Sequence, residues 1–200
     1  GGGRSSARET IGRVAAGAIA EKFLKKLNIS VTAYAKSIGP VEVSPERMDL
    51  SEIRNNRFCL PDAEAAKAAE IYLDQKIAEC DSVGGVVECV ISGLPVGLGE
   101  PVFEKLDANL AKAIRDGVAA TKACGSDNND EFRMDGDKIV KETNHAGGVL
   151  GGISDGSDVV FRAAFKPTPS IAKSQETVTK DGENIDLVIH GRHDPVVVPR

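Results

Sequence analysis

The chain contains no tryptophan and few other aromatic residues, so large rings cannot dominate its core. Aromatic residues make up 4% of the 200 residues, while hydrophobic residues as a whole reach 41%. That fraction is sufficient for a packed core, which must consist mainly of alanine, valine, isoleucine and leucine. The length suits one large domain or two small ones, and we expect residues 1–200 to form a single domain.

Sequence signatures of several enzyme classes are also absent. No G-x-G-x-x-G motif follows a predicted strand, and neither a Walker lysine nor a G-x-S-x-G elbow is present. The cysteines form no C-x-x-C pair and have no metal-ligand spacing, so we expect reduced, mostly buried thiols and no metal site. The four positions are Cys59, Cys80, Cys89 and Cys124. These absences disfavour hydrolases, kinases and metalloenzymes.

Charge and hydropathy restrict the partners. The formal net charge of −5 disfavours general nucleic-acid binding, which requires a basic face, although a local basic pocket is compatible with it. No apolar run approaches the length that crosses a bilayer, and no signal peptide is visible. We therefore expect a cytoplasmic protein with neither a nucleic-acid nor a membrane partner.

Hydrophobic periodicity alternates between helical and strand patterns, which predicts a mixed α/β domain. Helices are predicted over 8–27, 62–80 and 100–114, and strands over 29–38, 86–92, 159–165 and 185–189, with a further candidate strand over 119–124. The first helix is rich in alanine and contains two glycines, so it can pack closely and we expect it to be buried. Ser6 and Glu9 have capping-box spacing at its start. Residues 41–61 are mixed and polar, which indicates a surface excursion.

Two glycine-rich segments have both a functional and a purely structural interpretation. Gly1–Thr10 places three glycines, two arginines and two serines before a helix, which favours an anion site over a capped helix with solvated arginines. Asn144–Gly156 contains two glycine pairs, which suit either a flat ligand lying against bare backbone or ordinary turns between strands. His145 within it is interpreted as a surface or hydrogen-bonded histidine.

Two further polar clusters follow predicted strands. Lys166–Ser170 has two prolines that pre-set the backbone beside lysine, threonine and serine donors, which suits an anionic group or a rigid loop. His190–Asp194 brings a base, a cation and a carboxylate within five residues. Arg192 is suited to clamp a phosphate or polarise a ring carbonyl, and Asp194 to stay ionised and act in proton transfer. The alternative is a surface ion pair.

Taken in order, these clusters resemble the chorismate synthase family. Similar family blocks are found over residues 1–18, 92–103, 144–154, 165–170 and 191–195, so the resemblance spans essentially the whole chain. It implies an α/β (α+β) fold with helices packed between β-sheets. It also implies a lyase of the shikimate pathway that converts 5-enolpyruvylshikimate 3-phosphate to chorismate plus phosphate by 1,4-elimination, with reduced FMN (FMNH2) as cofactor. A homotetramer and an association with NADP belong to the same resemblance.

The resemblance also implies roles for individual residues. Those that match the family's flavin-binding positions are Arg4, Ser5, Ser6, Gly151, Lys166, Pro167, Thr168, Pro169, Ser170 and Arg192. Asp194 matches the family's acidic residue near the reactive flavin nitrogen, where it assists proton transfer. The departing phosphate would be stabilised by positive groups.

The sequence departs from the family pattern in three places. The N-terminal part that carries the family's catalytic histidines and substrate arginines is absent, as are a stretch between Ile114 and Asp116 and the C-terminal helix. The three histidines at 145, 190 and 193 do not replace the missing pair. We therefore expect the 200 residues alone to be inactive. Two other interpretations remain: a non-catalytic module that binds FMN or phosphate, and a structural core fragment that binds neither.

Overall fold

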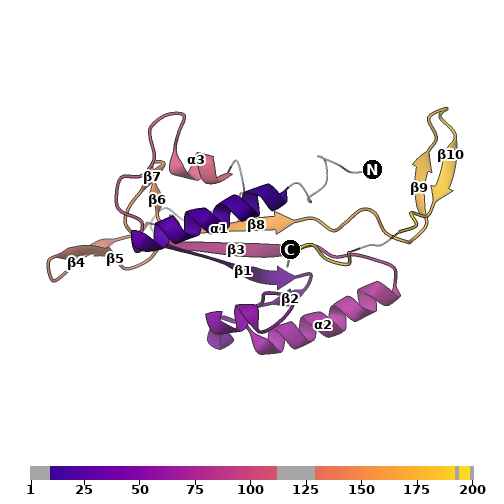
Figure 1. Ribbon diagram of the computed structural model, residues 1–200, viewed down its shortest axis with the longest axis horizontal. Helices are drawn as coiled ribbons and strands as arrows, with labels where there is room; N and C mark the ends of the chain where they lie inside the picture. Colours follow the sequence, from indigo (N-terminus) through magenta and orange to yellow (C-terminus); the bar gives the residue numbers. More distant parts are fainter. Residues whose placement is uncertain (1–9, 112–128, 192–193, 199–200) are drawn as a thin grey trace. The chain divides into compact units, whose positions relative to one another are not determined.

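The computed structural model describes residues 10–111, 129–191 and 194–198, and these ranges combine helices with strands (Figure 1). The helices are α1 (Ile11–Lys26), α2 (Ala63–Ala78) and α3 (Leu106–Ala111), with two short 3-10 turns, η3 (Pro45–Arg47) and η4 (Leu50–Arg54). The strands are β1 (Ser30–Ile38), β2 (Val41–Glu42), β3 (Gly85–Ser92), β4 (Phe132–Asp135), β5 (Lys138–Lys141), β6 (Val149–Leu150), β7 (Ile153–Ser154), β8 (Val159–Phe165), β9 (Gln175–Val178) and β10 (Asn184–Leu187). The predicted mixed α/β class is confirmed.

The largest sheet has the strand order β2-β1-β3-β8, and the other strands form the two-stranded sheets β4-β5, β6-β7 and β9-β10. The chain divides into two compact units. Within the described residues, the first unit contains 10–32, 89–111 and 129–161, and the second contains 33–88, 162–191 and 194–198. Strands β1, β3 and β8 each contribute residues to both units. The single-domain organisation therefore stays a prediction.

The second unit has a well-defined apolar core. Its buried members are Ala35, Ile38, Val43, Phe58, Leu60, Ala66, Ala69, Leu73, Val196 and Val198. Three of them, Val43, Phe58 and Leu60, belong to the stretch expected to be a surface excursion, so that expectation fails at these positions although most of the stretch is exposed or half-buried. Their sequence neighbours are polar, and the burial results from the segment folding back onto β1, where the Ala35 N–H donates to the Cys59 carbonyl over 2.9 Å.

Helix α2 covers this core with a face of small side chains. It begins as predicted, with the buried Asp62 as N-cap accepting hydrogen bonds from the backbone N–H groups of Glu64 and Ala65 at 3.0 and 3.1 Å. The Arg47 guanidinium donates to the same carboxylate over 3.0 Å. Ala69 is fully buried and Leu73 nearly so, which lets α2 approach β2 closely (Figure 1).

Helix α1 in the first unit is exposed, which corrects the expectation that it is buried. None of its residues is buried, and Ile19 and Phe23 keep 74% and 64% of their surface exposed. The sequence spacing identified an apolar stripe, but a stripe is buried only where another element covers it. Its N-cap is Thr10, without a side-chain hydrogen bond. The expected capping box of Ser6 and Glu9 lies outside the described residues.

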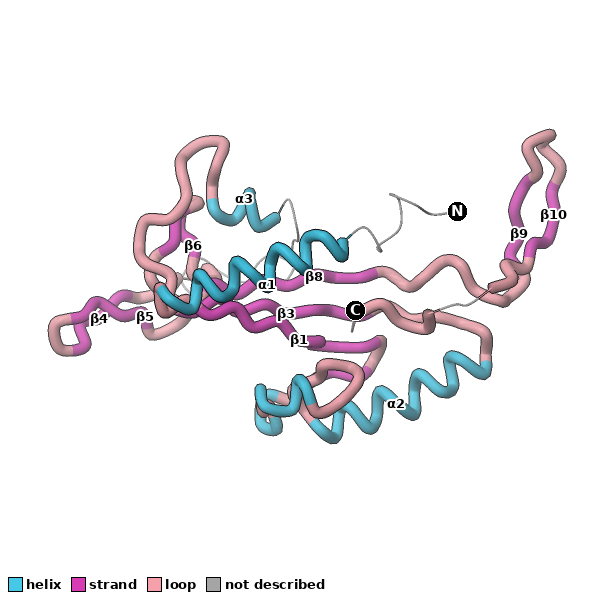
Figure 2. The backbone as a smooth tube through the Cα atoms, in the orientation of Figure 1, coloured by secondary structure: helices cyan, strands magenta, loops and turns pink. Residues whose placement is uncertain are grey.

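The other predicted elements hold with changes at their ends. Strand β8 has the predicted bounds, but α3 begins at Leu106 instead of Glu100, because Gly99 has a positive φ and Glu100 bridges to Glu104 in a turn. Figure 2 shows this stretch and the segment after β8 as loops. The last predicted strand is β10, which ends at Leu187. Hairpin β4-β5 was not predicted, and of hairpin β9-β10 only the second strand was. The candidate strand over 119–124 lies outside the described residues.

Three cysteines lie within the described ranges, and all three are free thiols, as expected. Cys89 is buried, Cys59 is partly exposed and Cys80 is exposed, so the expectation of mostly buried thiols was wrong. Burial raises the pKa of the Cys89 thiol.

Candidate functional site

The segment Lys166–Ser170, predicted to bind an anion, leaves the end of β8 in the second unit. Two residues just before β3 fix its path. The Ser82 hydroxyl donates to the Thr168 carbonyl over 2.6 Å, and Gly84 lies directly beneath the backbone of Phe165 and Lys166. A Cβ at position 84 would overlap the Phe165 carbonyl oxygen and lie 3.2 Å from Pro167 Cδ. The absence of a side chain at Gly84 therefore permits this approach.

The other predicted cluster of the second unit is anchored to the same short stretch. The Val83 N–H donates to the Pro195 carbonyl over 2.8 Å, which fixes the backbone directly after Asp194. Beyond it, Val196 and Val198 are buried in the core, and the Gly85 Cα approaches Val198 so closely that a Cβ would lie 2.7 Å from its Cγ2. Residues 82–85 thus anchor both the segment that follows β8 and the backbone at Pro195, directly after Asp194.

Sequence reasoning missed Ser82, Val83 and Gly84. The adjacent glycines at 84 and 85, directly before a predicted strand, are the signal that marks a close backbone approach. The stretch is held from its other side by Asp81, whose carboxylate accepts from the Lys173 ammonium over 2.6 Å and from the Ser82 N–H over 2.8 Å. These hydrogen bonds, led by that from Lys173, lower the pKa of Asp81.

Polar groups along Lys166–Ser170 are available to a ligand. Lys166 and Ser170 are exposed, and Thr168 is half-buried. The Thr168 hydroxyl oxygen is inaccessible to solvent and has no hydrogen-bond partner among the described residues. An unsatisfied buried hydroxyl is costly, and such groups mark places where a further molecule is expected.

Gly151 lies in the first unit, at the turn between β6 and β7. Glycines 147, 148, 151 and 152 all have positive φ, which side-chain-bearing residues rarely adopt. Gly151 is exposed, and a Cβ there would meet nothing within 4 Å. Neighbouring Gly152 is buried, and its carbonyl accepts from the Leu106 N–H over 2.7 Å. The turn therefore presents bare backbone at Gly151 on a fixed base.

A buried ion cluster, which sequence reasoning missed, lies beside this turn. The Lys141 ammonium contacts Asp130 at 3.2 Å and Asp155 at 2.8 Å, and the three side chains expose 3%, 2% and 7% of their surface respectively. Burial acts to raise the pKa of Asp130, but hydrogen bonds, led by that from Thr143, outweigh it and hold this pKa far below its usual range. Burial also acts to raise the pKa of Asp155, but hydrogen bonds, led by that from Lys141 and joined by those from Ser157, together outweigh it and lower this pKa.

The remaining predicted site residues are outside the described ranges. These are Arg4, Ser5, Ser6 and Arg192, together with His193. His145 and His190 are described and exposed. No group of three or more His, Cys, Asp or Glu side chains within the described ranges is arranged to hold a metal ion. Over the same ranges, every helix is too short or too polar to cross a membrane.

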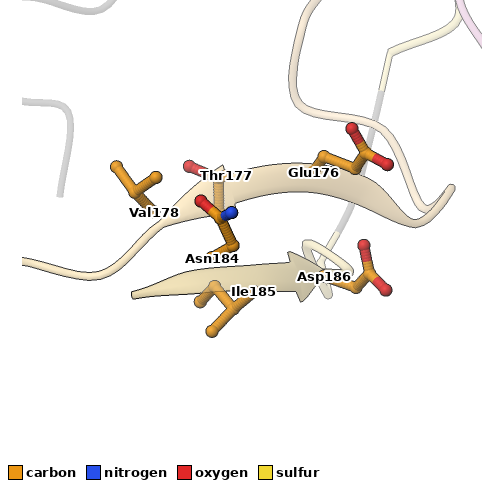
Figure 3. Close-up of a pocket in the computed structure, with 6 residues that line it drawn as sticks. All are labelled: Glu176, Thr177, Val178, Asn184, Ile185 and Asp186. Carbon is orange, nitrogen blue, oxygen red and sulfur yellow. The ribbon is translucent and has the colours of Figure 1, made fainter. Parts of the chain in front are cut away.

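A pocket of about 440 Å³ lies on the β9-β10 hairpin, and Figure 3 shows its six lining residues. None of the predicted site residues lines it. Glu176 and Asp186 face each other in the register of the two strands, so the pocket carries two carboxylates. Like charges repel, and an anionic cofactor would not be attracted to this surface.

The comparisons with known proteins agree with the motif order. The profile of the chorismate synthase family matches residues 1–200. Curated proteins named chorismate synthase include those of Agathobacter rectalis, 57% identical over 211 residues, and Lachnoclostridium phytofermentans, 56% identical over 212 residues. Each alignment covers 100% of this chain and 58% of the relative, so the chain spans about three fifths of their length.

A solved structure gives the same result. "Crystal Structure of Chorismate Synthase" matches with a TM-score of 0.76 and 30% sequence identity, covering 83% of this chain and 57% of that chain. The alignments with the curated relatives are longer than the 200 residues of the chain, so those relatives carry additional residues inside the aligned region. From the match over every residue and the shared fold, it follows that this chain belongs to the chorismate synthase family.

Proposed function

We propose that the chain forms the cofactor-binding part of a chorismate synthase. The whole protein would convert 5-enolpyruvylshikimate 3-phosphate to chorismate and phosphate by 1,4-elimination, using reduced FMN. The observation that carries the proposal is the convergence of two family segments on residues 82–85, where Ser82 holds Thr168 and Val83 holds Pro195. The strand order places the segment after β8 beside the start of β3, and the ligand groups of both family segments would be used at this shared anchor.

The residues of Lys166–Ser170 suit the anionic part of FMN. Lys166 would contribute positive charge and Ser170 a hydroxyl donor, and both residues are exposed. Arg4, Ser5, Ser6, Gly151 and Arg192 would complete the flavin site by family resemblance. When bound in its reduced form, FMN supplies an electron-rich ring that stabilises the allylic centre of the substrate while phosphate leaves.

Asp194 would hold and move a proton near the flavin. Its backbone position is set by the hydrogen bond from the Val83 N–H to the carbonyl of Pro195, the next residue in the chain. Cations near the leaving phosphate, with Arg192 as a candidate, would stabilise its developing charge. The catalytic histidines of the family have no counterpart among the matched residues of this chain.

A flavin titration combined with a turnover assay tests the proposal. Under anaerobic conditions the chain is titrated with reduced FMN, and formation of chorismate from 5-enolpyruvylshikimate 3-phosphate is then followed. We expect Lys166→Ala and Arg192→Ala to weaken flavin binding by about tenfold each, since a charge-assisted hydrogen bond contributes roughly 1.5–3 kcal/mol. Asp194→Asn should retain flavin binding and lower turnover in a protein that is active.

The outcomes separate three interpretations. Flavin binding with turnover supports a complete catalyst, and flavin binding without turnover identifies a cofactor-binding module. Absence of flavin binding, with a normal unfolding transition, would reduce the chain to a structural core and overturn the proposal. Glu176→Gln, on the acidic hairpin pocket, serves as the matched control and should leave the flavin affinity unchanged.

Family resemblance also leads us to propose a homotetrameric, cytoplasmic protein. NADP would be associated with the protein through the reaction that provides reduced flavin. Light scattering coupled to size-exclusion chromatography tests the oligomeric state, and a monomer at micromolar concentration would contradict the tetramer.

A further inference from the structure

The glycine-rich segment of residues 144–156 is held at both ends by one side chain, Lys141. Its ammonium donates to the Asn144 side-chain oxygen at 3.1 Å and to the Asp155 carboxylate at 2.8 Å. The third donor is used by Asp130 at 3.2 Å. All three ammonium hydrogens therefore have acceptors, and the two ends of the segment meet at one buried charge.

Asp130 fixes the backbone at the start of the segment. Its carboxylate accepts from the His145 N–H at 2.7 Å and the Ala146 N–H at 2.9 Å, and from the Thr143 hydroxyl at 2.6 Å. These donors lie immediately before the first glycine pair. The entry to the turn is therefore held by a charged acceptor, which forms stronger hydrogen bonds than a neutral one.

Asp155 and its neighbours fix the other end. The Asp155 N–H donates to the Gly148 carbonyl over 3.1 Å, and its carboxylate accepts from the Ser157 N–H over 2.9 Å. The Asn144 side-chain amide donates to the Asp158 carbonyl over 2.7 Å, which ties the two ends directly. Gly151, exposed at the tip, is the part of the segment that these bonds leave accessible.

The composition of the cluster argues for a role in setting geometry. Two carboxylates and one ammonium give it a net charge of −1 away from solvent, and desolvating such groups offsets much of their mutual attraction. Buried ion clusters can often be replaced by apolar side chains without loss of stability. What apolar side chains could not reproduce is the set of backbone hydrogen bonds that holds a glycine-rich turn in one conformation. Fixing a turn beforehand reduces the entropy lost when a ligand binds to it.

We propose that Asp130, Lys141 and Asp155 form a clamp that holds the turn of residues 147–152 in the conformation that receives the flavin cofactor. Lys141 is thus a positioning residue that does not itself touch the cofactor. The relevance of the clamp to the cofactor depends on the proposed function, whereas its effect on the turn does not.

The experiment compares clamp variants of the 200-residue chain by two measurements. The first is amide hydrogen exchange without any ligand, read at His145, Ala146 and Asp155. The second is the dissociation constant of reduced FMN, measured by calorimetric titration under anaerobic conditions. Lys141→Met should remove the protection of the three amides and weaken FMN binding by about tenfold or more, because the turn must then be ordered on binding.

Two substitutions of Asp155, one conservative and one not, distinguish a positioning role of the cluster from a general effect on the stability of the chain. Asp155→Asn keeps one acceptor oxygen, which can serve either Lys141 or Ser157, so it should lose less FMN affinity than Asp155→Ala, which should lose about as much as Lys141→Met. This pair also decides the question if Lys141→Met does not fold. Asp62→Asn is the control, since it destabilises the N-terminus of α2 and should lower the unfolding temperature without changing FMN affinity.

Each outcome has one meaning. If wild-type protein shows the three protected amides but does not bind FMN, the clamp stands and the proposed function fails. If the chain binds FMN, and both Lys141→Met and Asp155→Ala bind it as tightly as wild type, the clamp has no role in the site and the inference is overturned. Unchanged amide protection in Lys141→Met would overturn it as well.

Discussion

Gly84 has no room for a side chain, because a Cβ there would overlap the Phe165 carbonyl oxygen and press against Pro167. The neighbouring atoms are backbone and a rigid proline ring, so they cannot move aside as the end of a flexible side chain could. Contact between this glycine and the end of β8 is what allows Lys166–Ser170 to turn over the start of β3.

Gly84→Ala should therefore both destabilise the protein and disturb the candidate site. We expect a loss of about 1–3 kcal/mol in the free energy of unfolding, typical of overpacking at a tight position, measured by urea denaturation. Reduced FMN should bind more weakly, because the Lys166–Ser170 backbone is displaced.

Gly17→Ala provides the control for this prediction. Gly17 lies in helix α1 with nothing within 4 Å of an added Cβ, so alanine should stabilise the helix by roughly 0.5–1 kcal/mol. An equal response of the two variants would show that the close approach at Gly84 has no energetic consequence.

Residue types alone identified some parts of the site and missed others. Lys166–Ser170 and Asp194 were predicted because donors, prolines and a carboxylate gather over a few residues. Ser82 and Gly84 could not be assigned to the site in the same way, since their partners Thr168 and Phe165 lie about eighty residues further along the chain. Such a pairing follows from the strand order of the sheet, which a single sequence does not specify.

At the level of elements, α1 has an apolar stripe without a cover in the described part of the first unit. The exposed fractions of Ile11, Ile19 and Phe23 are 76%, 74% and 64%. Side chains this exposed contribute little to the stability of the chain, because their apolar surface remains in water. Together they should instead form an apolar surface on α1 that binds apolar probes.

The double substitution Ile19→Ser and Phe23→Ser tests this property of α1. We expect the free energy of unfolding to change by less than about 1 kcal/mol, while binding of the fluorescent apolar dye ANS falls clearly. Leu73→Ser in α2 is the contrasting control, since Leu73 is 2% exposed and its loss should cost roughly 2–5 kcal/mol. A stability loss in the α1 variant as large as that of Leu73→Ser would mean that the stripe is packed in solution.

Helices and strands were predicted well where the apolar spacing extends over many residues. They were predicted poorly where a turn sets the first or last residue of the element. Helix α2 and strand β8 followed directly from spacing, whereas α3 is shorter than its apolar pattern because Gly99 and the following turn delay its start. Hairpin β4-β5 carried a signal that was not used. Gly136-Asp137 forms the two-residue loop between the paired Asp135 and Lys138, and a glycine with positive φ at the first loop position favours a tight hairpin turn.

Across the whole molecule, buried carboxylates occur in both units. Asp62 and Glu88 lie in the second unit, and Asp130 and Asp155 in the first. Burial acts to raise the pKa of each, but hydrogen bonds and nearby cations outweigh it, so all four pKa values are lowered by folding. For Glu88 the partners are the Tyr34 hydroxyl and the Arg162 guanidinium.

A carboxylate whose pKa is lowered by folding stabilises the native state only while it is ionised. Its contribution is complete above the unfolded pKa of about 4 and is lost as the pH falls through the lower, folded value. The native state of this chain should therefore have nearly constant stability from neutral pH to about pH 5 with respect to these groups, and lose stability steeply below about pH 4. Because such carboxylates are present in both units, acid should weaken both.

Urea denaturation at a series of pH values measures this slope. Asp62→Asn and Asp155→Asn should each reduce stability at neutral pH and flatten the acid limb, since an amide cannot gain the proton that the carboxylate gains on unfolding. Asp181→Asn, at an exposed turn, should leave the profile unchanged. Parallel acid limbs for wild type and both buried variants would contradict the assignment of acid sensitivity to these carboxylates. If the chain is a single cooperative domain, the flattening should be equal whether unfolding is followed by far-ultraviolet or by near-ultraviolet circular dichroism.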